Sequence, residues 1–479
     1  MKTHLSRRTF LSTVGTGLLG YAATSCFTRS DASGKQRKPN FVVIFVDDMG
    51  YGDIGCFGST KNRTPCLDRM AEEGAKFTSF YVTSGVCSPS RASLLTGCYP
   101  LRIGMHQSDR GCFVIVPGDR RGLHPNERTI PEVLKTQGYV SICIGKWHQG
   151  DQPEFLPTSQ GFDTYFGIPY SNDMGYTDRN KGLPPLPLMR DEKIIEAPVD
   201  QNTLTKRYTE EAVKFIRQNK NKPFFLYLPH TMVHTPLHVS EQFQNRSPNG
   251  IFTDAVEEID WSTQQIMSTL KELKLDRNTL VIFTSDNGGT RRSNNGPFSG
   301  GKAQTREGGM RVPCVMRWPG KIPPGTVCDE VTSTIDFLPT FAHLSGATVP
   351  PDRAIDGKDI SDLLFNKPGA KSPHEAFYYY FMSQLQAVRS GRWKLYVRCD
   401  PLIKGWMGKP EGIQEEALYD LEADTKETTN VAAEHPDVVK RLNALAEAAR
   451  RDIGDYQLKG SGQRPPGHVE KPVMLRMAQ

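Results

Sequence analysis

The sequence lacks the cysteine patterns of a disulfide-stabilised scaffold or a zinc site. Its ten cysteines are spread over 479 residues, with no CxxC pair and no His/Cys spacing typical of zinc ligands. Most of them are therefore expected to be ordinary buried thiols. A cysteine with a chemical role has to be identified from its local motif.

Long runs of positive charge are also absent. The net charge is +6, and the lysines and arginines are scattered along the chain. A protein that binds a nucleic-acid backbone needs clustered positive charge, so this pattern argues against a DNA or RNA partner. The mild positive excess either helps to attract an anionic substrate or serves solubility.

No apolar run is long enough to span a bilayer, but the N-terminus is typical of an export signal. Ser6-Arg7-Arg8-Thr9-Phe10-Leu11 precedes a weakly apolar stretch that ends at Ala23, as in twin-arginine signals. Ala23-Thr24-Ser25-Cys26 is similar to a bacterial lipoprotein cleavage site, with alanine where leucine is usual. We therefore expect an exported bacterial protein, either periplasmic or membrane-anchored through a lipid on Cys26.

Residues 1–38 are predicted to be this export signal and a polar linker. From residue 39 onward, four short apolar runs rich in β-branched residues predict strands that are buried on both faces. The expected strands are 41–46, 140–144, 224–228 and 280–284, and helical patterns lie between or after them at 64–75, 129–137, 203–218, 255–273 and 335–344. This alternation predicts an α/β fold with a doubly wound sheet.

The pattern changes after about residue 370. Short strands are expected at 377–381, 386–389 and 393–397, followed by a helix at 436–451. These elements predict a small antiparallel α+β subdomain. The expected boundaries are 39–370 for a catalytic domain and 371–479 for the C-terminal subdomain and a loosely attached polar tail from Leu458.

Polar residues follow the predicted strands, where functional groups collect in α/β sheets. Asp47-Asp48 and Asp286-Asn287 each end a strand and together offer only oxygen ligands, which suit calcium or magnesium and not zinc. Either pair alone is also consistent with a turn or a helix cap. Two such pairs at strand ends favour a metal site.

Cys87-Ser88-Pro89-Ser90-Arg91 is the most distinctive local motif. It is expected to open a helix, whose free backbone N–H groups attract an anion. Arg91 follows Cys87 too closely for a cysteine-phosphatase loop, and a purely structural cysteine is the remaining alternative.

Several cationic side chains also follow strands or lie in glycine-marked loops. A lone lysine or histidine usually belongs to the surface or the core. As a group, they can offset charge on an oxyanion and protonate a leaving alkoxide. The residues concerned are Lys146, His148, His234, which follows His230, and Lys302.

Together these motifs resemble the formylglycine-dependent sulfatases of the alkaline-phosphatase superfamily, especially the arylsulfatases. The resemblance extends from Pro39 to about Ile453. It implies an alkaline-phosphatase-like fold, with a large mixed central sheet flanked by helices and a small C-terminal antiparallel subdomain. The matching stretches are 47–53, 87–97, 145–148, 167–171, 286–288 and 418–421.

The resemblance implies that a formylglycine-generating enzyme oxidises Cys87 to an aldehyde, whose hydrated form attacks sulfur and later expels sulfate. It implies a calcium ion, with magnesium less expected, bound by Asp47, Asp48, Asp286, Asn287 and the modified Cys87. Arg91, Lys146 and His148 would hold or activate the nucleophile. Ser171, Lys146, His234 and Lys302 would contact the sulfate, and the last two would also protonate the leaving group.

The chain departs from the family pattern at three positions, none of which removes a catalytic group. Cys98 stands where arginine is frequent, Cys66 where asparagine is usual, and Gln149 where leucine is frequent. The effect of Cys98 on local packing is left open by the sequence.

The implied activity is hydrolysis of sulfate esters in a sulfated small molecule or polysaccharide. Two alternatives stay open: a phosphodiesterase or phosphonate hydrolase with the same nucleophile, and a non-catalytic surface protein that binds sulfated glycans. Specificity would depend on loops, with candidate residues His238, Arg291, Arg292, Asn295 and the stretch 404–406.

Overall fold

The computed structural model describes residues 37–178, 180–399 and 415–477, and residues 38–479 form one compact unit. The predicted export signal with Cys26 and the stretch 404–406 lie outside the described residues. Among the residues that are described, no helix combines the length and the apolar character needed to cross a membrane.

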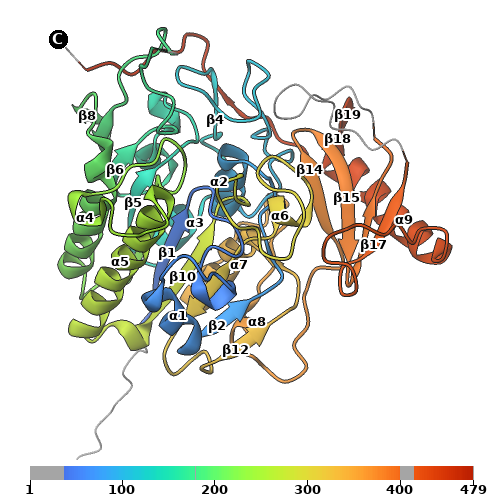
Figure 1. Cartoon of the computed structure of the whole chain (residues 1–479). Helices are drawn as coiled ribbons and strands as arrows, with labels where there is room; N and C mark the ends of the chain where they lie inside the picture. The colour runs from blue at the N-terminus through green and yellow to red at the C-terminus, as the bar shows by residue number, and fades with distance from the viewer. Residues whose placement is uncertain (1–36, 179, 400–414, 478–479) are drawn as a thin grey trace, which may run out of the picture. The chain divides into compact units, whose positions relative to one another are not determined.

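A ten-stranded mixed sheet forms the centre of this unit (Figure 1). Its five central strands, β10, β1, β9, β5 and β6, are parallel, and antiparallel strands adjoin them on both sides. In spatial order the sheet contains β12 (Thr326–Cys328), β2 (Ala75–Phe77), β11 (Cys314–Arg317), β10 (Thr279–Ser285), β1 (Asn40–Val46), β9 (Phe224–Pro229), β5 (Val140–Lys146), β6 (Thr164–Ile168), β7 (Leu188–Arg190) and β8 (Lys193–Glu196).

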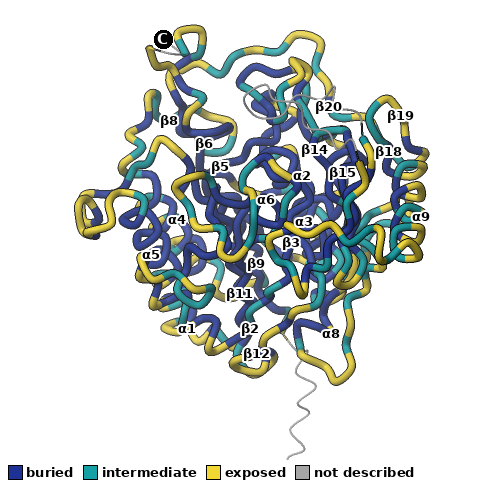
Figure 2. Tube along the Cα trace, turned by 45° about the vertical axis from the view of Figure 1, so that its right-hand side comes forward, coloured by how far each residue is buried: buried dark blue, intermediate teal, exposed yellow. Residues whose placement is uncertain are grey.

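Helices cover both faces of the sheet, and the alternation of side chains along β1 shows how. Val42, Ile44 and Val46 belong to the core under α1 (Pro65–Glu72), α4 (Leu204–Gln218) and α5 (Ile251–Glu272). Phe41, Val43 and Phe45 belong to the core under α2 (Cys87–Thr96), α3 (Ile130–Lys135) and α7 (Phe337–Ser345). Successive strand residues point to opposite faces, so β1 is buried on both, as Figure 2 shows for the central strands.

The four predicted central strands are confirmed, and each differs from its predicted bounds by only one or two residues. The central strand β6 and the outer strands were not predicted, because they are short, most are partly exposed, and they carry little periodic signal. The first predicted helix is too long: α1 ends at Glu72, and residues 75–77 form β2, which pairs with β11 and β12.

The C-terminal part forms a separate antiparallel sheet, as predicted, but with four strands where the sequence pattern predicted three. Its strands are β14 (Phe377–Phe381), β15 (Gln384–Ser390), β16 (Trp393–Tyr396) and β17 (Ala417–Asp420), and α9 (Pro436–Asp452) packs on it around a third core. The short helices α6 (Glu307–Met310) and α8 (Ser361–Leu364) precede this sheet.

The expectation of a loosely attached tail is wrong. Residues beyond Leu458 return to the catalytic part, where β20 (Gly467–His468) pairs with β4 (Arg121–Gly122). Arg464 donates two hydrogen bonds to Glu127 and contacts the Cys98 sulfur at 3.3 Å. A guanidinium from the tail thus lies beside Cys98, the position where the family often has arginine. The polar composition of the tail did not predict this docking, because the contacts that hold the tail in place are themselves made by polar side chains.

Candidate active site

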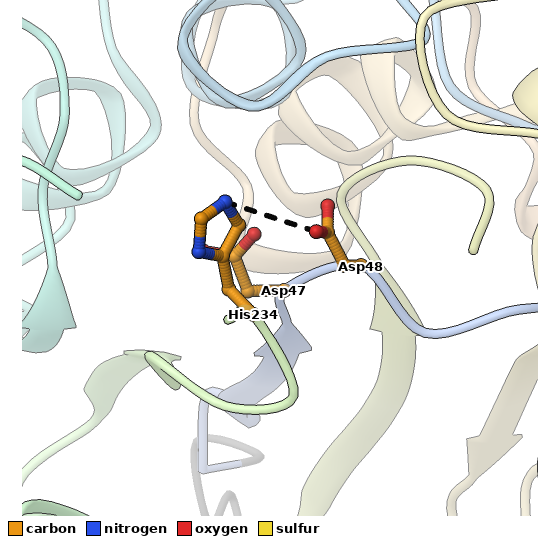
Figure 3. Close-up of side chains that lie close together, drawn as sticks. All are labelled: Asp47, Asp48 and His234. Atoms are coloured by element: carbon orange, nitrogen blue, oxygen red, sulfur yellow. Dashed lines mark ion pairs between the residues drawn. The ribbon is translucent and has the colours of Figure 1, made fainter. Parts of the chain in front are cut away.

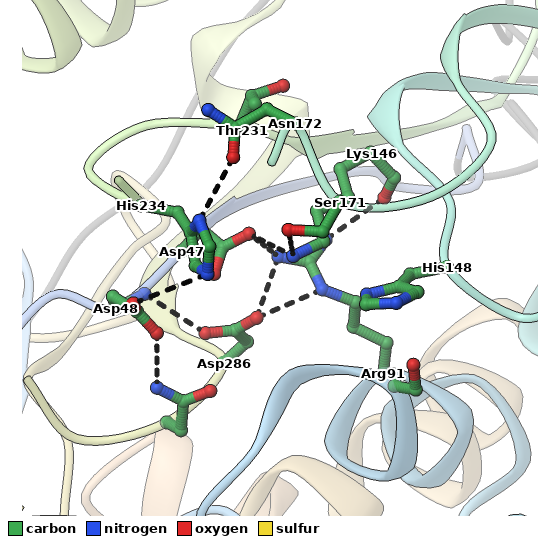
Figure 4. A network of polar contacts seen from close by, with 12 residues as sticks. Asp47, Asp48, Arg91, Lys146, His148, Ser171, Asn172, Thr231, His234 and Asp286 are labelled. Carbon is green, nitrogen blue, oxygen red and sulfur yellow. Dashed lines mark hydrogen bonds and ion pairs between the residues drawn. The ribbon is translucent and has the colours of Figure 1, made fainter. Parts of the chain in front are cut away.

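The carboxyl ends of the five parallel strands lead into one polar cluster (Figure 4). Asp47 and Asp48 follow β1, Asp286 and Asn287 follow β10, and Lys146 ends β5. The loops after β6 and β9 add Ser171 and His234, and the first turns of α2 add Cys87 and Arg91. These sequence-predicted site residues therefore lie at this edge of the sheet, as expected for a parallel α/β arrangement.

The end of β5 requires glycine next to Lys146. Gly145 has φ +127°, and a Cβ atom there would lie 1.9 Å from the Pro229 carbonyl oxygen of β9. Only glycine tolerates both this backbone conformation and this close approach. The adjacent Lys146 side chain is thereby held in the cluster, fully buried.

Arg91 and Lys146 bind the carboxylates at the centre of the site. The Arg91 guanidinium donates two hydrogen bonds to Asp286 Oδ2, at 3.0 and 2.7 Å, and lies 3.2 Å from Asp47 Oδ2. Lys146 Nζ donates to Asp47 Oδ2 at 2.6 Å and to Ser171 Oγ at 3.2 Å. All four charged side chains are fully buried, so each needs the others to offset the cost of desolvation.

The same contacts set the protonation of these groups. Burial alone would raise the pKa of Asp47, but Lys146 and Arg91 hold it well below its usual range. Burial and the charge of Asp47 raise the pKa of Asp286 to about 7. The pKa of Lys146 is raised despite burial, because Asp47 stabilises its charged form. Asp47 and Asp286 are thus closely packed and share the positive charge of Arg91.

A second group of contacts surrounds Asp48. Lys302 Nζ lies 2.8 Å from Asp48 Oδ1 and donates to Oδ2 at 2.9 Å, and the Asn287 amide donates to Oδ1 at 2.8 Å. Burial opposes the charge on Lys302, but Asp48 raises its pKa above the ordinary lysine value. Lys302 is therefore protonated throughout the neutral pH range.

His148 is held as a neutral base. Its Nε2 lies 2.9 Å from the Ile115 carbonyl oxygen, which can only accept, so Nε2 carries the proton and Nδ1 has a free lone pair. Nδ1 is buried and has no hydrogen-bond partner among the residues that the structure describes. Burial, Lys146 and Arg91 lower the pKa of His148 well below its usual value.

Asn172 orients His234, and it was missed by the sequence analysis. The Asn172 amide nitrogen donates to Gln201 and to the Pro236 carbonyl, which directs its Oδ1 toward His234 Nδ1 at 2.9 Å. His234 Nδ1 therefore carries a proton, and Nε2 lies 3.8 Å from Asp48 Oδ2. Burial and Lys302 lower the pKa of His234. Only its position next to Ser171 could have drawn attention to Asn172.

Cys87 begins α2 and is buried beside these charges. Burial raises the pKa of its thiol, which the charges of Lys146 and Lys302 lower and those of Asp47 and Asp286 raise. Arg91 follows one turn later, on the same face of the helix. Cys87, the predicted nucleophile, is therefore close enough to both groups of contacts for their charges to shift its pKa.

The residues present fit a hard divalent cation. Asp47, Asp48 and His234 offer ligand atoms that lie within 4.8 Å of one another (Figure 3), and Asp286 Oδ1 accepts from the Asp48 backbone at 3.2 Å. Asp47 Oδ1 and Asn287 Oδ1 are buried without a hydrogen-bond partner in the described part of the chain. Such orphaned oxygens are costly unless a ligand binds them. Since calcium prefers oxygen ligands, Asn287 and the aspartates suit it better than His234 does.

Other candidates named from the sequence do not join the cluster. His230 is packed in the core, where its Nε2 contacts Ser262 and burial lowers its pKa to about 3. Asn295 braces the loop by bonding Gly289 and Gly300. His238 contacts Asn202, and Arg291 and Arg292 are exposed.

Sequence comparisons agree with this geometry. The family described as Sulfatase matches residues 39–347, and the family described as N-sulphoglucosamine sulphohydrolase, C-terminal, matches residues 301–452. Dog N-acetylgalactosamine-6-sulfatase is 40% identical over 384 residues, which cover 76% of this chain and 73% of the relative. Human arylsulfatase A is 38% identical over 451 residues, which cover 85% of this chain and 87% of the relative.

Solved structures show the same fold. The PsFucS1 sulfatase from Pseudoalteromonas sp. superposes with a TM-score of 0.77 at 28% identity, over 87% of this chain and 90% of that one. Ps i-CgsB in complex with k-i-k-neocarrahexaose superposes with a TM-score of 0.74 at 30% identity, over 86% and 92%. A phosphonate monoester hydrolase of Agrobacterium radiobacter, 19% identical with a TM-score of 0.57, shares the fold alone. This chain belongs to the sulfatase family, and it is a hydrolase of sulfate esters.

Proposed function

We propose that this sulfatase cleaves sulfate esters of carbohydrates, with a formylglycine derived from Cys87 and a calcium ion at the carboxylate cluster. The observation that carries the proposal is the convergence of Cys87 with three buried cations and three carboxylates. The carbohydrate substrate is supported by relatives whose names refer to sulfated sugars, including N-acetylgalactosamine-6-sulfatase.

The metal would be held by Asp47, Asp48, Asp286 and Asn287, together with the modified side chain at position 87. When bound there, calcium supplies positive charge to offset the sulfate oxygens. Formylglycine at position 87 supplies a hydrated aldehyde, with hydroxyl groups for attack on sulfur and for release of sulfate.

The chain's own residues position and protonate these groups. Arg91 and Lys146 orient Asp47 and Asp286, and Lys146 also holds Ser171. His148 offers an unprotonated Nδ1 as the base, because Ile115 fixes its proton on Nε2. Lys302 and His234 lie on the Asp48 side of the site, where both can contact a bound sulfate. Lys302 is protonated and can donate to the leaving oxygen, and His234 can do so through Nε2 when both of its ring nitrogens carry protons.

Alanine variants of His234 and Lys302 are expected to affect sugar sulfates more than activated aryl sulfates. A sugar alkoxide is far more basic than nitrophenolate, so loss of a proton donor slows its departure more. The measurement is kcat/KM for a sugar sulfate and a nitrophenyl sulfate in His234→Ala and Lys302→Ala. Equal losses on both substrates would contradict the acid role and indicate sulfate binding. Activity at wild-type level on both would exclude the two residues from the reaction.

A panel of sulfated sugars, aryl sulfates and phosphate diesters tests the substrate class. We expect the highest kcat/KM on a sulfated sugar, because the cations suit the sulfate and the relatives' names refer to sugar sulfates. A higher kcat/KM on phosphate diesters or phosphonates at equal leaving-group basicity would support the phosphodiesterase alternative. A preference confined to aryl sulfates would contradict the carbohydrate proposal.

Export and maturation are part of the same proposal. The twin-arginine-type segment in residues 1–38 supports export of a folded protein to the periplasm or, through a lipid on Cys26, to a membrane. A formylglycine-generating enzyme would modify Cys87 before export. A sulfated polysaccharide or a smaller sulfated sugar outside the cytoplasm is the substrate that fits this location.

A further inference from the structure

The loop that carries Lys302 is anchored by the C-terminal sheet. This loop, residues 299–306, lies between the end of β10 and α6, and Lys302 is its contribution to the active site. Both ends of the loop contact side chains that come from β15, β16 and the segment after β17. Residues more than eighty positions away in the sequence therefore determine where this loop lies.

Lys394 on β16 is the centre of this anchor. Its ammonium donates to the Thr305 carbonyl at 2.8 Å and to Glu307 Oε1 at 3.0 Å, and lies 2.9 Å from Glu427 Oε1. It also lies 3.9 Å from the centroid of the Tyr379 ring. The side chain is fully buried, and these acceptors offset the cost of burying an ammonium group.

Glu427 connects the two ends of the loop. Its Oε2 accepts from Ser299 Oγ at 3.3 Å and from the Glu307 backbone N–H at 2.9 Å. Its Oε1 accepts from Tyr396, whose hydroxyl also lies 3.1 Å from the Thr305 carbonyl. Ser299 and Thr305 lie on either side of Lys302, so the buried Glu427 carboxylate and its partners hold both ends of the 299–306 loop.

The path of the loop leaves little room for adjustment. The Ala303 N–H donates to the Gly85 carbonyl, two residues before Cys87, and the Lys302 N–H donates to Gly289. Gly309 is so close to the loop that a Cβ atom there would lie 2.1 Å from the Gln304 carbonyl oxygen. Movement of Thr305 would therefore be transmitted to Lys302 and to the segment before Cys87. Misplacement of a catalytic group by about 1 Å can cost roughly 100-fold in rate.

We propose that Lys394, Glu427 and Tyr396 are positioning residues for Lys302, through which the C-terminal sheet completes the active site. The inference rests on the proposed role of Lys302 in the reaction. None of the three side chains contacts the Asp47–Asp286 cluster in the described structure, so their effect on catalysis passes through the 299–306 loop.

The test is a double-mutant cycle between the anchor and Lys302. Glu427→Gln keeps the shape of the side chain but removes its charge, and Tyr396→Phe removes one hydroxyl. We expect each to lower kcat/KM for a sugar sulfate by roughly 10- to 100-fold, the usual range for residues that orient catalytic groups. In a Lys302→Ala background, the same changes should cause no further loss, because residues that act through one group are not additive.

Asp356→Asn is the matched control. Asp356 is a largely buried carboxylate that binds Arg102 and the Tyr99 backbone, and it makes no hydrogen bond to the 299–306 loop. This variant should lower the melting temperature and keep wild-type kcat/KM. Tyr396→Phe carries the test if Glu427→Gln does not fold, since it removes no buried charge.

The outcomes separate the two proposals. The positioning role is overturned if Glu427→Gln or Tyr396→Phe lowers kcat/KM by the same factor in the Lys302→Ala background as in the wild type. It is also overturned if both variants keep wild-type kcat/KM while Lys302→Ala is impaired. Full activity in Lys302→Ala would instead contradict the proposed function of Lys302, and the positioning role with it. Anchor losses that disappear in the Lys302→Ala background would support both.

Discussion

Replacement of Cys87 by alanine is expected to lower kcat/KM for sulfate esters by about 10⁴-fold or more, as removal of a nucleophile does in other hydrolases. Cys87 is the first residue of α2, is buried, and has a thiol pKa that the charges of Lys146 and Lys302 lower. Alanine fits the same helical position, so the protein should fold and its melting temperature should stay close to that of the wild type.

The matched control is Cys66→Ala. Cys66 is also a buried cysteine in the first turn of a helix, α1, but it lies outside the active site. This variant should keep its activity. Mass spectrometry of the tryptic peptide 77–91 provides the direct measurement, because conversion of the CH2SH group to an aldehyde changes its mass. A fully active enzyme with an unmodified thiol at Cys87 would falsify the proposed nucleophile.

Loss of Asp286, which we propose as a metal ligand, is expected to cause the second largest effect. Asp286→Asn should lower kcat/KM by about 10²- to 10³-fold, the cost of removing a preorganised electrostatic contact in an active site. Exhaustive chelation of the wild type should have a similar effect, and added calcium should restore activity. Calcium at about 100 times its dissociation constant should also stabilise the wild type by about 2.7 kcal/mol, and the variant by less.

Two further variants separate metal binding from ion pairing. Asp286 also binds Arg91, so its loss disturbs a buried pair, whereas the Asn287 side chain donates only to Asp48 and to the Gly288 carbonyl in the described hydrogen bonds. Asn287→Ala should therefore weaken the response to calcium with less loss of stability. Asp260→Asn is the control, since Asp260 is a buried carboxylate that caps α1 away from the site. Full activity in metal-free protein, verified by elemental analysis, would exclude the metal.

The sequence by itself determined four of the five central strands and the local motifs at their ends. β1 is buried on both faces, so its run of apolar residues is continuous and easily recognised. Each functional motif is a short contiguous stretch of the chain, so its chemistry is visible without a structure. These stretches are the Asp47-Asp48 pair after β1, Asp286-Asn287 after β10 and the Cys87 motif at the start of α2. The parallel order of these strands then predicts that the groups meet at one edge.

The tertiary structure alone decided how these groups are oriented and held. The proton of His234 depends on Asn172, which is bound in turn by Gln201 and the Pro236 carbonyl, and the proton of His148 depends on the Ile115 carbonyl. Lys394 and Glu427 anchor the loop that carries Lys302 from a separate sheet. Arg464 lies beside Cys98 although 366 positions separate them. These contacts join residues that are remote in sequence and that come together only when the backbone has folded. No local period or motif therefore predicts them.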